Sequence, residues 1–526
     1  MTRPNPVKAY TARLLLASSL ACGCAAACAA ALAAEVSWQA AASDAEVDRA
    51  FTQARAEHKP LLLYWGAKWC PPCNQLKATL FNRQDFIERS RAFVPVYVDG
   101  DLPGAQKLGR RFKVRGYPTL ILFKPEGAEI TRLPGEANAA QVMQVLQLGL
   151  AGGRPVGAVL ADAQAGKPLA PNEWKLLAYY SWDTDEEQLV PQAGRAGLLG
   201  SLAVACPAQE TEAATRLWLK ALATSDDGQG VKADAALRGR VMKVLADPAA
   251  SRTQMDVLTS SAAEITRAVT SRAAGGQRAV VIAAYDKALQ RLEADATLSR
   301  ADRMGALIAQ IDLARIDLAR DANTVQLPAP LLKDVREQVA RADREITDGY
   351  ERQAVVTAGA HALAQAGLGA ESDALLKANL AQSHSPYYLM SALAANAKAR
   401  GDKAGALRWY EQAFAASEGP ATRLQWGASY VSALVELSPQ DAPRIERAAG
   451  QLFAEAGAQP GAFYERSARS LQRAGRKLQS WNSTGAHNAA MQRLQAQLTP
   501  VCARLPVEDA QRSTCDTLLR GTSNPG

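Results

Sequence analysis

The pattern of apolar and polar positions changes its period repeatedly between residues 37 and 150. A capping box, SDAE at 43–46, opens a stretch in which apolar side chains recur at helical spacing. PLLLYW at 60–65 is a short continuous apolar run, which is typical of a strand buried on both faces. This first stretch therefore predicts a helix followed by a buried strand.

The rest of this region continues the alternation of helices and strands. Helices are expected from Pro71, over 102–112 and from near Asn138, and strands at 92–99, 118–124 and 129–133. The last two strands flank the turn PEGA and are expected to pair antiparallel. Together these elements predict an α/β domain at 35–150, with a mixed central sheet and helices on both faces.

Strand signals nearly vanish after the segment AGGRP at 151–155. We interpret 151–157 as a linker and 158–526 as a large all-α region, because the remainder is Ala/Leu/Arg-rich amphipathic helix broken by Gly, Pro and Asp.

The spacing of glycines and prolines within this region indicates an internal repeat. Gly367 and Gly401 are 34 residues apart, and so are Pro386 and Pro420. The small and aromatic residues around Gly401 resemble the tetratricopeptide repeat, in which paired helices cross at small side chains. This favours an α-solenoid, with an irregular helical domain as the alternative.

The N-terminal segment 1–34 has the composition of a secretory signal peptide. Residues 1–13 carry three basic residues and no acidic one, and an uncharged run rich in Ala extends from Leu14 to Ala34. A transmembrane anchor and a lipoprotein cleaved before Cys22 are the alternatives. We expect export to the periplasm.

Export determines how the eight cysteines are counted. Three lie in the signal region, so the mature chain keeps an odd number and at least one thiol is free or pairs outside the chain. The remaining cysteines are Cys70, Cys73, Cys206, Cys502 and Cys515.

Net charge gives no support to nucleic-acid binding. The formal charge is +8 for the whole chain, and charges of both signs are mixed along it without a basic block. An anionic membrane surface is only weakly favoured as a partner.

WCPPC at 69–73 carries the chemistry of the chain. A zinc site would need four ligands, and the four histidines are scattered without a second cysteine pair at suitable spacing. A c-type haem site would need His after the second cysteine, where this chain has Asn74. No metal and no cofactor are therefore expected, and two inert buried cysteines remain the plain alternative to a redox pair.

The redox interpretation has a physical basis at each position. Pro71 suits the first helical position, so Cys70 becomes the N-cap at the positive end of the helix dipole. Because neither proline has an N–H, the first backbone donor able to reach the Cys70 sulfur is that of Cys73. We expect this environment to lower the pKa of Cys70 and make it the nucleophile, with Cys73 as the resolving thiol. Lys68 is a candidate for additional positive potential.

These residues resemble the thioredoxin family over about 37–150. WCPPC matches the family's W-C-x-x-C signature, and VRGYPTLILFK at 114–124 resembles its second signature. The resemblance implies a thioredoxin fold and a cis peptide between Tyr117 and Pro118. It also implies that Trp69, Tyr117 and Pro118 contact the substrate peptide.

Two departures from cytosolic thioredoxins affect the expected function. Tyr64 stands where those proteins carry a buried acid that assists proton transfer to the resolving cysteine. The segment at 79–101 is more similar to the C-terminal domain of periplasmic thiol–disulfide transporters. The resemblance therefore implies an envelope redox protein.

Two classes of function remain open at this point. The first is an envelope thiol–disulfide oxidoreductase that reduces disulfides of exported proteins, with a membrane thiol–disulfide transporter as electron donor; formation or isomerisation of those disulfides is the alternative within this class. The second is a redox-linked chaperone or scaffold in which the tetratricopeptide-like region is the main functional module.

The remaining cysteines are assigned structural roles. Cys502 and Cys515 flank a short connection between two helical segments, and an oxidising compartment favours a bridge between them. Cys206 lies in an apolar helical stretch with no nearby partner and is expected to be a buried small residue.

Overall fold

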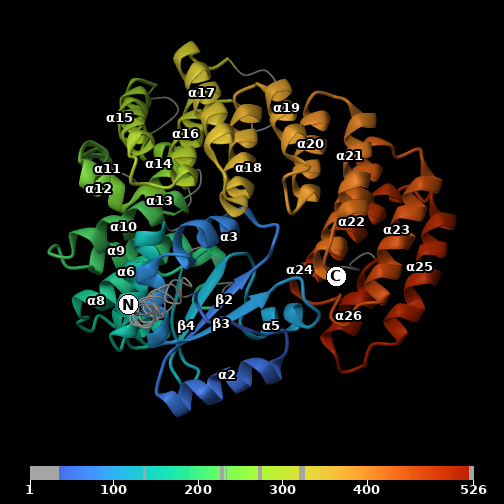
Figure 1. Cartoon of the computed structure of the whole chain (residues 1–526), viewed down its shortest axis with the longest axis horizontal. Coiled ribbons are helices and arrows are strands. Elements are labelled where there is room, and N and C mark those ends of the chain that lie inside the picture. The colour runs from blue at the N-terminus through green and yellow to red at the C-terminus, as the bar shows by residue number, and fades with distance from the viewer. Residues whose placement is uncertain are drawn as a thin grey trace, which may run out of the picture.

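Five strands form one mixed sheet near the centre of the molecule (Figure 1). The computed structural model describes residues 35–133, 138–183, 185, 188–225, 230–232, 234–270, 275–318 and 326–520. The strands are β1 (Gln39–Ala40), β2 (Leu61–Gly66), β3 (Val94–Asp99), β4 (Thr119–Phe123) and β5 (Glu129–Leu133). Their order in the sheet is β1-β3-β2-β4-β5, with β1, β3 and β2 parallel and β4 and β5 antiparallel to their neighbours. The predicted signal peptide lies outside the described residues.

The central strand β2 is buried along its whole length, as its apolar run predicts. Leu62 and Tyr64 point into one apolar core, whereas Leu63 lies with Leu61 and Trp65 in the core on the other face. This alternation follows from the two-residue period of a strand. The predicted mixed sheet is confirmed.

Helices cover both faces of this sheet. They are α2 (Asp44–Glu57), α3 (Pro71–Leu76), α4 (Gln84–Arg89), α5 (Ala105–Arg111) and α6 (Ala139–Leu150). Ser43 caps α2 by accepting a hydrogen bond from the Glu46 N–H, while the Glu46 carboxylate accepts one from the Ala42 N–H. In an ideal capping box the Glu46 carboxylate would accept from the Ser43 N–H, so the expected box forms with this bond shifted by one residue. It fixes the start of α2.

The described residues after α6 contain helices and no strands. The first group is α7 (Val156–Gln164), α8 (Pro171–Tyr179), α9 (Arg195–Ala205), α10 (Thr211–Ala223), α11 (Ala235–Ala246), α12 (Pro248–Thr253), α13 (Met255–Ser260) and α14 (Ala262–Val269). The second group is α15 (Gly275–Ala294), α16 (Arg300–Ala314), α17 (Ala329–Glu345), α18 (Gly349–Gln365) and α19 (Gly369–Asn379). The third group is α20 (Pro386–Ala399), α21 (Lys403–Ala416), α22 (Pro420–Leu437), α23 (Ala442–Gly457), α24 (Glu465–Trp481), α25 (Asn488–Ala503) and α26 (Ala510–Thr517).

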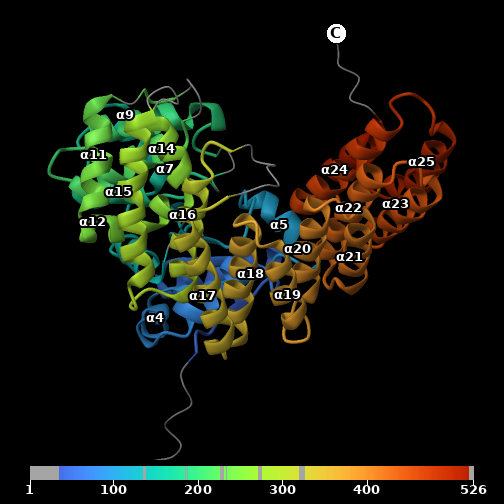
Figure 2. The same ribbon diagram turned by 90° about the horizontal axis from the view of Figure 1, so that it is seen from above.

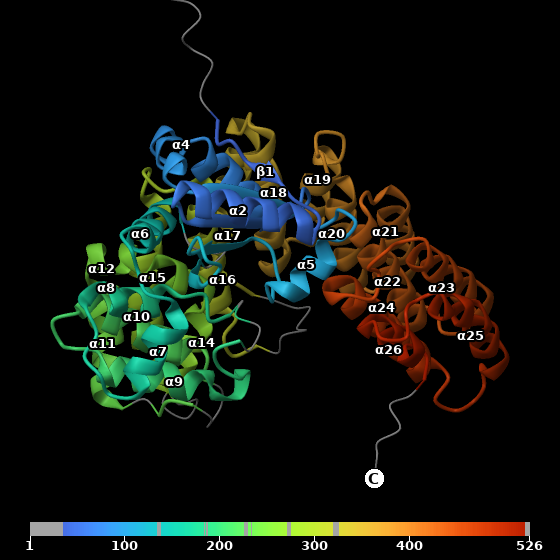
Figure 3. The same cartoon turned by 90° about the horizontal axis from the view of Figure 1, so that it is seen from below.

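These helices form an arc around the sheet domain. In Figure 1 the arc runs from α8 on the left, over α16 and α18, to α22 and α26 on the right, and the blue sheet domain lies inside it. Figure 2 shows the two ends of the arc as separate groups on either side of the domain. Figure 3, seen from below, shows α2 on the side of the domain that faces away from α18.

The 34-residue spacing corresponds to equivalent places in the arc. Gly367 and Gly401 each take a positive φ in the turn between two helices, α18/α19 and α20/α21. Glycine is suited to both turns because it adopts this conformation without the strain of a Cβ. Pro386 and Pro420 begin α20 and α22, where a missing N–H costs nothing.

One apolar core continues from the sheet domain into the arc. Leu120 and Leu146 of the sheet domain belong to the same buried cluster as Val159 of α7, Trp174 of α8 and Leu217 of α10. Helix α7 begins within the predicted linker, at Val156. The division at 151–157 therefore stays a prediction about the chain, while the packing across it is continuous.

Among the helices formed by the described residues, none combines the length and the apolarity that crossing a bilayer requires.

Candidate active site

Cys70 and Cys73 lie together at the start of α3. Cys70 is the N-cap residue, and the Cys73 N–H donates a hydrogen bond of 3.4 Å to the Cys70 sulfur. The two sulfur atoms are 2.8 Å apart, and both cysteines are free thiols. This geometry places a dithiol one helical turn apart, close enough to close a disulfide with a small adjustment.

The second signature lies directly against this pair. The peptide bond between Tyr117 and Pro118 is cis. The Cys70 thiol donates a weak hydrogen bond of 3.4 Å to the Tyr117 carbonyl oxygen. The structure thus brings together four of the residues singled out from the sequence, across 47 positions of chain.

Trp69 contacts the C-terminal part of the helical arc. Its ring stacks on Tyr388 of α20, with centroids 5.8 Å apart and an interplanar angle of 17°, and meets Trp426 of α22 edge-on at 5.4 Å. The Arg466 guanidinium of α24 lies 4.6 Å from the Trp69 ring centroid and 5.3 Å from that of Tyr117. We call Tyr388, Trp426 and Arg466 the aromatic cover.

Asp101 fixes the same contact with hydrogen bonds. Its carboxylate accepts bonds from the Trp69 indole N–H at 3.2 Å and from the Thr422 hydroxyl at 2.6 Å. The Arg466 guanidinium is 3.6 Å from this carboxylate, and the Arg466 backbone N–H donates to the Gln106 side chain at 3.0 Å. A buried acid of the sheet domain therefore holds two helices of the arc against the active site.

Lys68 does not contribute to this buried network. Its ammonium lies 3.4 Å from the Glu418 carboxylate, and the two side chains are 53% and 72% exposed. An ion pair with this exposure contributes little to stability because water screens it.

The arc changes the electrostatics expected for Cys70. Cys70 is only 3% exposed, and this burial raises the pKa of its thiol well above the ordinary value. The neighbouring Cys73 thiol adds to the rise, whereas the Cys73 N–H and the Arg466 charge oppose it. The lowered pKa expected at the helix N-terminus is therefore wrong for this closed arrangement, because dehydration outweighs the Cys73 N–H and the Arg466 charge.

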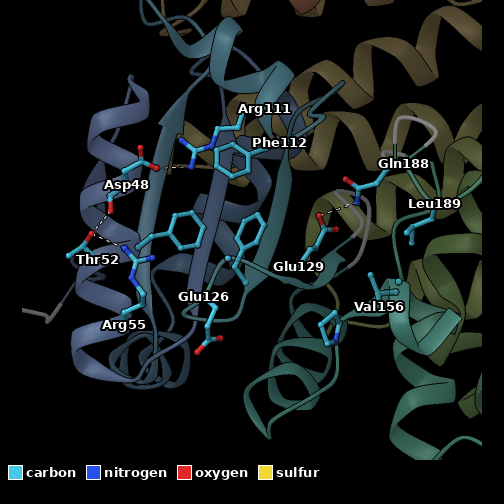
Figure 4. A pocket seen from close by; sticks show the side chains of 15 residues that line it. Asp48, Thr52, Arg55, Arg111, Phe112, Glu126, Glu129, Val156, Gln188 and Leu189 are labelled. Atoms are coloured by element: carbon cyan, nitrogen blue, oxygen red, sulfur yellow. Dashed lines mark hydrogen bonds and ion pairs between the residues drawn. The ribbon is translucent and has the colours of Figure 1, made fainter. Parts of the chain in front are cut away.

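Two cavities lie near the sheet domain. The larger, about 600 Å³, is at the opposite end of β4 from Pro118, between α2 and the start of α7 (Figure 4). Arg111 in its wall is already paired with Asp48 at 2.7 Å, and its lining contains no thiol. The smaller, about 340 Å³, is lined by Pro72 and by 116–118 and so adjoins the dithiol.

Comparisons with known proteins agree with this geometry. A family model described as a thioredoxin-like domain matches residues 47–149. The thioredoxin of Mycolicibacterium smegmatis is 30% identical over 107 residues, which are 20% of this chain and 93% of that protein. The chain belongs to the thioredoxin family.

Two further proteins are each similar to a part of this chain. The thiol:disulfide interchange protein DsbD 2 of Pseudomonas aeruginosa is 33% identical over 99 residues, 18% of this chain. The match spans only 17% of the length of that relative. A solution structure of a thioredoxin from Thermus thermophilus aligns with 19% of this chain and 80% of its own, at 28% identity and a TM-score of 0.18. The predicted similarity of the domain to thiol–disulfide interchange proteins is confirmed.

Tyr64, which the resemblance aligns with the buried acid of cytosolic thioredoxins, lies within the core of the sheet domain. It is 2% exposed, stacks on Tyr97 with centroids 5.2 Å apart, and its hydroxyl has no hydrogen-bond partner among the described residues. Burial and the nearby Cys73 thiol raise the pKa of this phenol. A neutral phenol cannot take the Cys73 proton, so this thioredoxin domain lacks a base at that place.

The other cysteines that the structure describes belong to apolar clusters different from that of the dithiol. Cys502 and Cys515 form a disulfide that joins α25 to the last helix, with Cα atoms 5.5 Å apart. Cys206 follows α9, is 7% exposed, and burial raises the pKa of its thiol to about 11. A thiol of this kind is inert at neutral pH.

Sequence reasoning missed the aromatic cover and Asp101. Asp101 and Thr422 are separated by 321 positions, so no local spacing relates them. The available signal was compositional: YY at 387–388 and QWG at 425–427 are aromatic positions in a region otherwise rich in Ala and Leu.

Proposed function

We propose that the protein is an envelope protein disulfide reductase. In this proposal the segment 1–34 directs export, the thioredoxin domain carries the chemistry, and the helical region, including a tetratricopeptide-like part, binds clients or partners. The similarity to thiol:disulfide interchange proteins supports thiol–disulfide exchange as the chemistry, and the reductive direction is part of the proposal.

The observation that carries the proposal is the dithiol at the start of α3. Two free sulfur atoms 2.8 Å apart, with the cis-Pro118 loop hydrogen-bonded to the first, form a geometry suited to one reaction. The buried Cys206 and the bridged Cys502 offer no comparable pair.

The reaction is two successive thiol–disulfide exchanges. The Cys70 thiolate attacks one sulfur of a client disulfide, so that a mixed disulfide forms and the other client sulfur leaves as a thiolate. Cys73 loses its proton to water and attacks the Cys70 sulfur, which releases the second client thiolate. The client gains two electrons and two protons, and the domain is left with a Cys70–Cys73 disulfide.

A reductant must then restore the dithiol. We propose the dithiol of a membrane thiol–disulfide transporter as the donor, because the domain is similar to part of such proteins. No nucleic acid enters the scheme.

The test is reduction of insulin by the purified protein, coupled to a dithiol reductant. We expect turnover by the wild type and by a Cys206→Ser control, none by Cys70→Ser, and a mixed disulfide trapped by Cys73→Ser and detected by intact mass. Full activity in Cys70→Ser would contradict the proposal. A strongly oxidising reduction potential of the Cys70–Cys73 pair would reverse the direction of the reaction.

A redox-linked chaperone is the second candidate, and the aromatic cover favours it. Because Trp69 contacts α20, α22 and α24, a change at the dithiol is transmitted directly to the arc. Suppression of client aggregation that depends on the oxidation state of Cys70, without insulin reduction, would favour this candidate.

A further inference from the structure

The smaller cavity has one wall from the active site and one from the arc. Pro72, Tyr117 and Pro118 line it on the thioredoxin side. The helical side includes residues 181–183, Leu199 of α9, the C-terminal end of α10 with Lys220, and α13 with the adjoining Ser261. Its volume of about 340 Å³ holds a few side chains of an extended peptide.

The other approaches to the dithiol are occupied by the protein itself. The aromatic cover and Asp101 hold Trp69 on one side. On another side α3 packs against α16 and α18: Gln75 donates to Asp302 at 3.0 Å, and the Lys77 ammonium lies 5.1 Å from the Tyr350 ring. A client strand that reaches the cis-proline loop therefore has to lie along the cavity.

Lys220 is the charged group of this cavity that is left without a full partner. Its side chain is 9% exposed, and its ammonium lies 3.7 Å from the Asp183 carboxylate, too far for a hydrogen bond. Asp183 is 59% exposed and already accepts a 3.2 Å hydrogen bond from Arg195. Within the part of the chain that the structure describes, no hydrogen-bond acceptor for this ammonium is found.

The negative charge of Asp256, which also lines the cavity, is neutralised by a buried ion pair. The Asp256 carboxylate is 5% exposed and pairs with the fully buried Arg216 guanidinium, and Gln141 donates to it at 2.8 Å. Asp183 is shared with Arg195, and Asp256 with Arg216, so Lys220 keeps only a 3.7 Å ion pair with an exposed carboxylate and a longer-range attraction to Asp256. A buried cation in this state gains most from an anionic partner.

We propose that this cavity is the client-binding subsite of the reductase and that Lys220 recognises a carboxylate next to the client cysteine. The substrate class is an extended, disulfide-bonded peptide segment with an acidic residue beside the cysteine that Cys70 attacks. The inference rests on the proposed function, since the exchange steps are the same, and it adds which clients are selected.

The test uses three synthetic peptides, each with one internal disulfide and either Asp, Asn or Lys next to the attacked cysteine. The fully reduced wild-type protein is mixed with excess peptide, and the second-order rate constant of peptide reduction is measured. We expect the Asp peptide to react about tenfold faster than the Lys peptide, a ratio equivalent to about 1.4 kcal/mol.

Two variants and a control decide the assignment. Lys220→Gln should bring the three rates together, and Lys220→Glu should reverse their order. Lys243→Glu, an exposed lysine of α11, should keep the wild-type order. Lys220 also lies in the last turn of α10, where a cation stabilises the helix dipole, but that role would change the yield of folded protein and not the ratio of the rates.

The outcomes separate this inference from the proposed function. Equal rates for all three peptides on the wild type, or an unchanged order in Lys220→Glu, would overturn the subsite while leaving the reductase intact. Failure to reduce any peptide would overturn the proposed function itself.

Discussion

The Cys70 thiol is subject to opposing influences of different origin. Burial under the arc disfavours its thiolate, whereas the Cys73 N–H and the Arg466 charge favour it. Arg466 is held in place by the rings of Trp69 and Tyr117 and lies close to Asp101. The cation that assists the dithiol thus comes from α24 and not from the thioredoxin domain.

Removing this cation should make Cys70 less reactive. In Arg466→Gln the pKa of Cys70 rises further, so the midpoint of the pH profile for alkylation by iodoacetamide should move up by about 0.5 pH unit or more, whatever the change in access does to the maximal rate. Because the pKa is raised, the rate should climb as pH increases, and the variant's curve should lie at higher pH than that of the wild type.

The pH profile of Cys70 alkylation is measured by mass spectrometry of the Cys70 peptide. Two control variants are measured in the same way. Arg466→Lys should keep most of the rate. Arg423→Gln removes a similar arginine, 5.1 Å from the Phe414 ring, and should leave the profile unchanged. Identical profiles for Arg466→Gln and wild type would show that the charge does not act on the thiol.

At this scale the sequence predicted what lies close along the chain. Cys70, Pro71 and Cys73 follow from helix-cap rules, and Pro118 follows from a second signature. The pKa of Cys70 could not be predicted in the same way. Its direction depends on dehydration by residues such as Trp426, which are adjacent only after folding.

At the scale of elements, the strands were predicted within one or two residues because each is a buried apolar run. The exception is β1, which has two residues, Gln39 and Ala40, and pairs only with β3. A segment this short has no period to recognise. Helix ends at Gly367 and Gly401 were marked by glycine itself.

Helix α15 contains a carboxyl group that makes stability depend on pH. Glu293 is 8% exposed and accepts a 2.9 Å hydrogen bond from Gln310, and burial together with the Asp334 charge raises its pKa to about 7 from 4.5. A raised pKa means that the stabilising effect of the neutral carboxyl is complete below about pH 4.5 and is lost as pH rises through about 7.

Glu293→Gln should therefore raise the melting temperature at pH 8 by a few degrees and flatten its decline between pH 5 and pH 8. Thermal melts at intervals of one pH unit measure this. Glu337→Gln, on the exposed face of α17, is the control. A variant that melts lower than wild type at pH 8 would contradict the expected sign.

The disulfide between α25 and α26 stabilises the end of the arc, where a helix has neighbours on one side only. The Cys502→Ser/Cys515→Ser variant should lose about 3 kcal/mol of unfolding free energy or less, as the chain-entropy model gives for a loop of this size. Denaturant unfolding with and without reductant tests it: the difference from wild type should disappear when the bridge is reduced.

At the scale of the whole molecule, the arc buries the dithiol, and we expect it to limit access to Cys70. Tyr388→Ala removes the ring stacked on Trp69, an interaction worth about 1 kcal/mol, and should speed alkylation of Cys70 by about fivefold. Tyr410→Ala, in α21, removes a ring that does not contact Trp69 and serves as the control. Equal rates in the two variants would show that the cover does not limit access.

How the arc lies against the thioredoxin domain could not be predicted from the sequence. Hydrogen bonds such as Thr422 to Asp101 and Arg469 to the Arg115 carbonyl join residues more than 300 positions apart. Neither periodicity nor a local motif relates such residues, because their proximity follows from the summed curvature of all the helices between them.

The separation of Cys70 from Arg466 along the chain also determines how long the dithiol stays uncovered during synthesis. A chain that emerges from the ribosome at 5–20 residues per second needs about 20–80 seconds to pass from one to the other. During that interval the thioredoxin domain has no cover, and its cysteines meet whatever oxidants surround the growing chain. The nascent protein and the finished one therefore present the same two sulfur atoms differently, first without the aromatic cover and later beneath it.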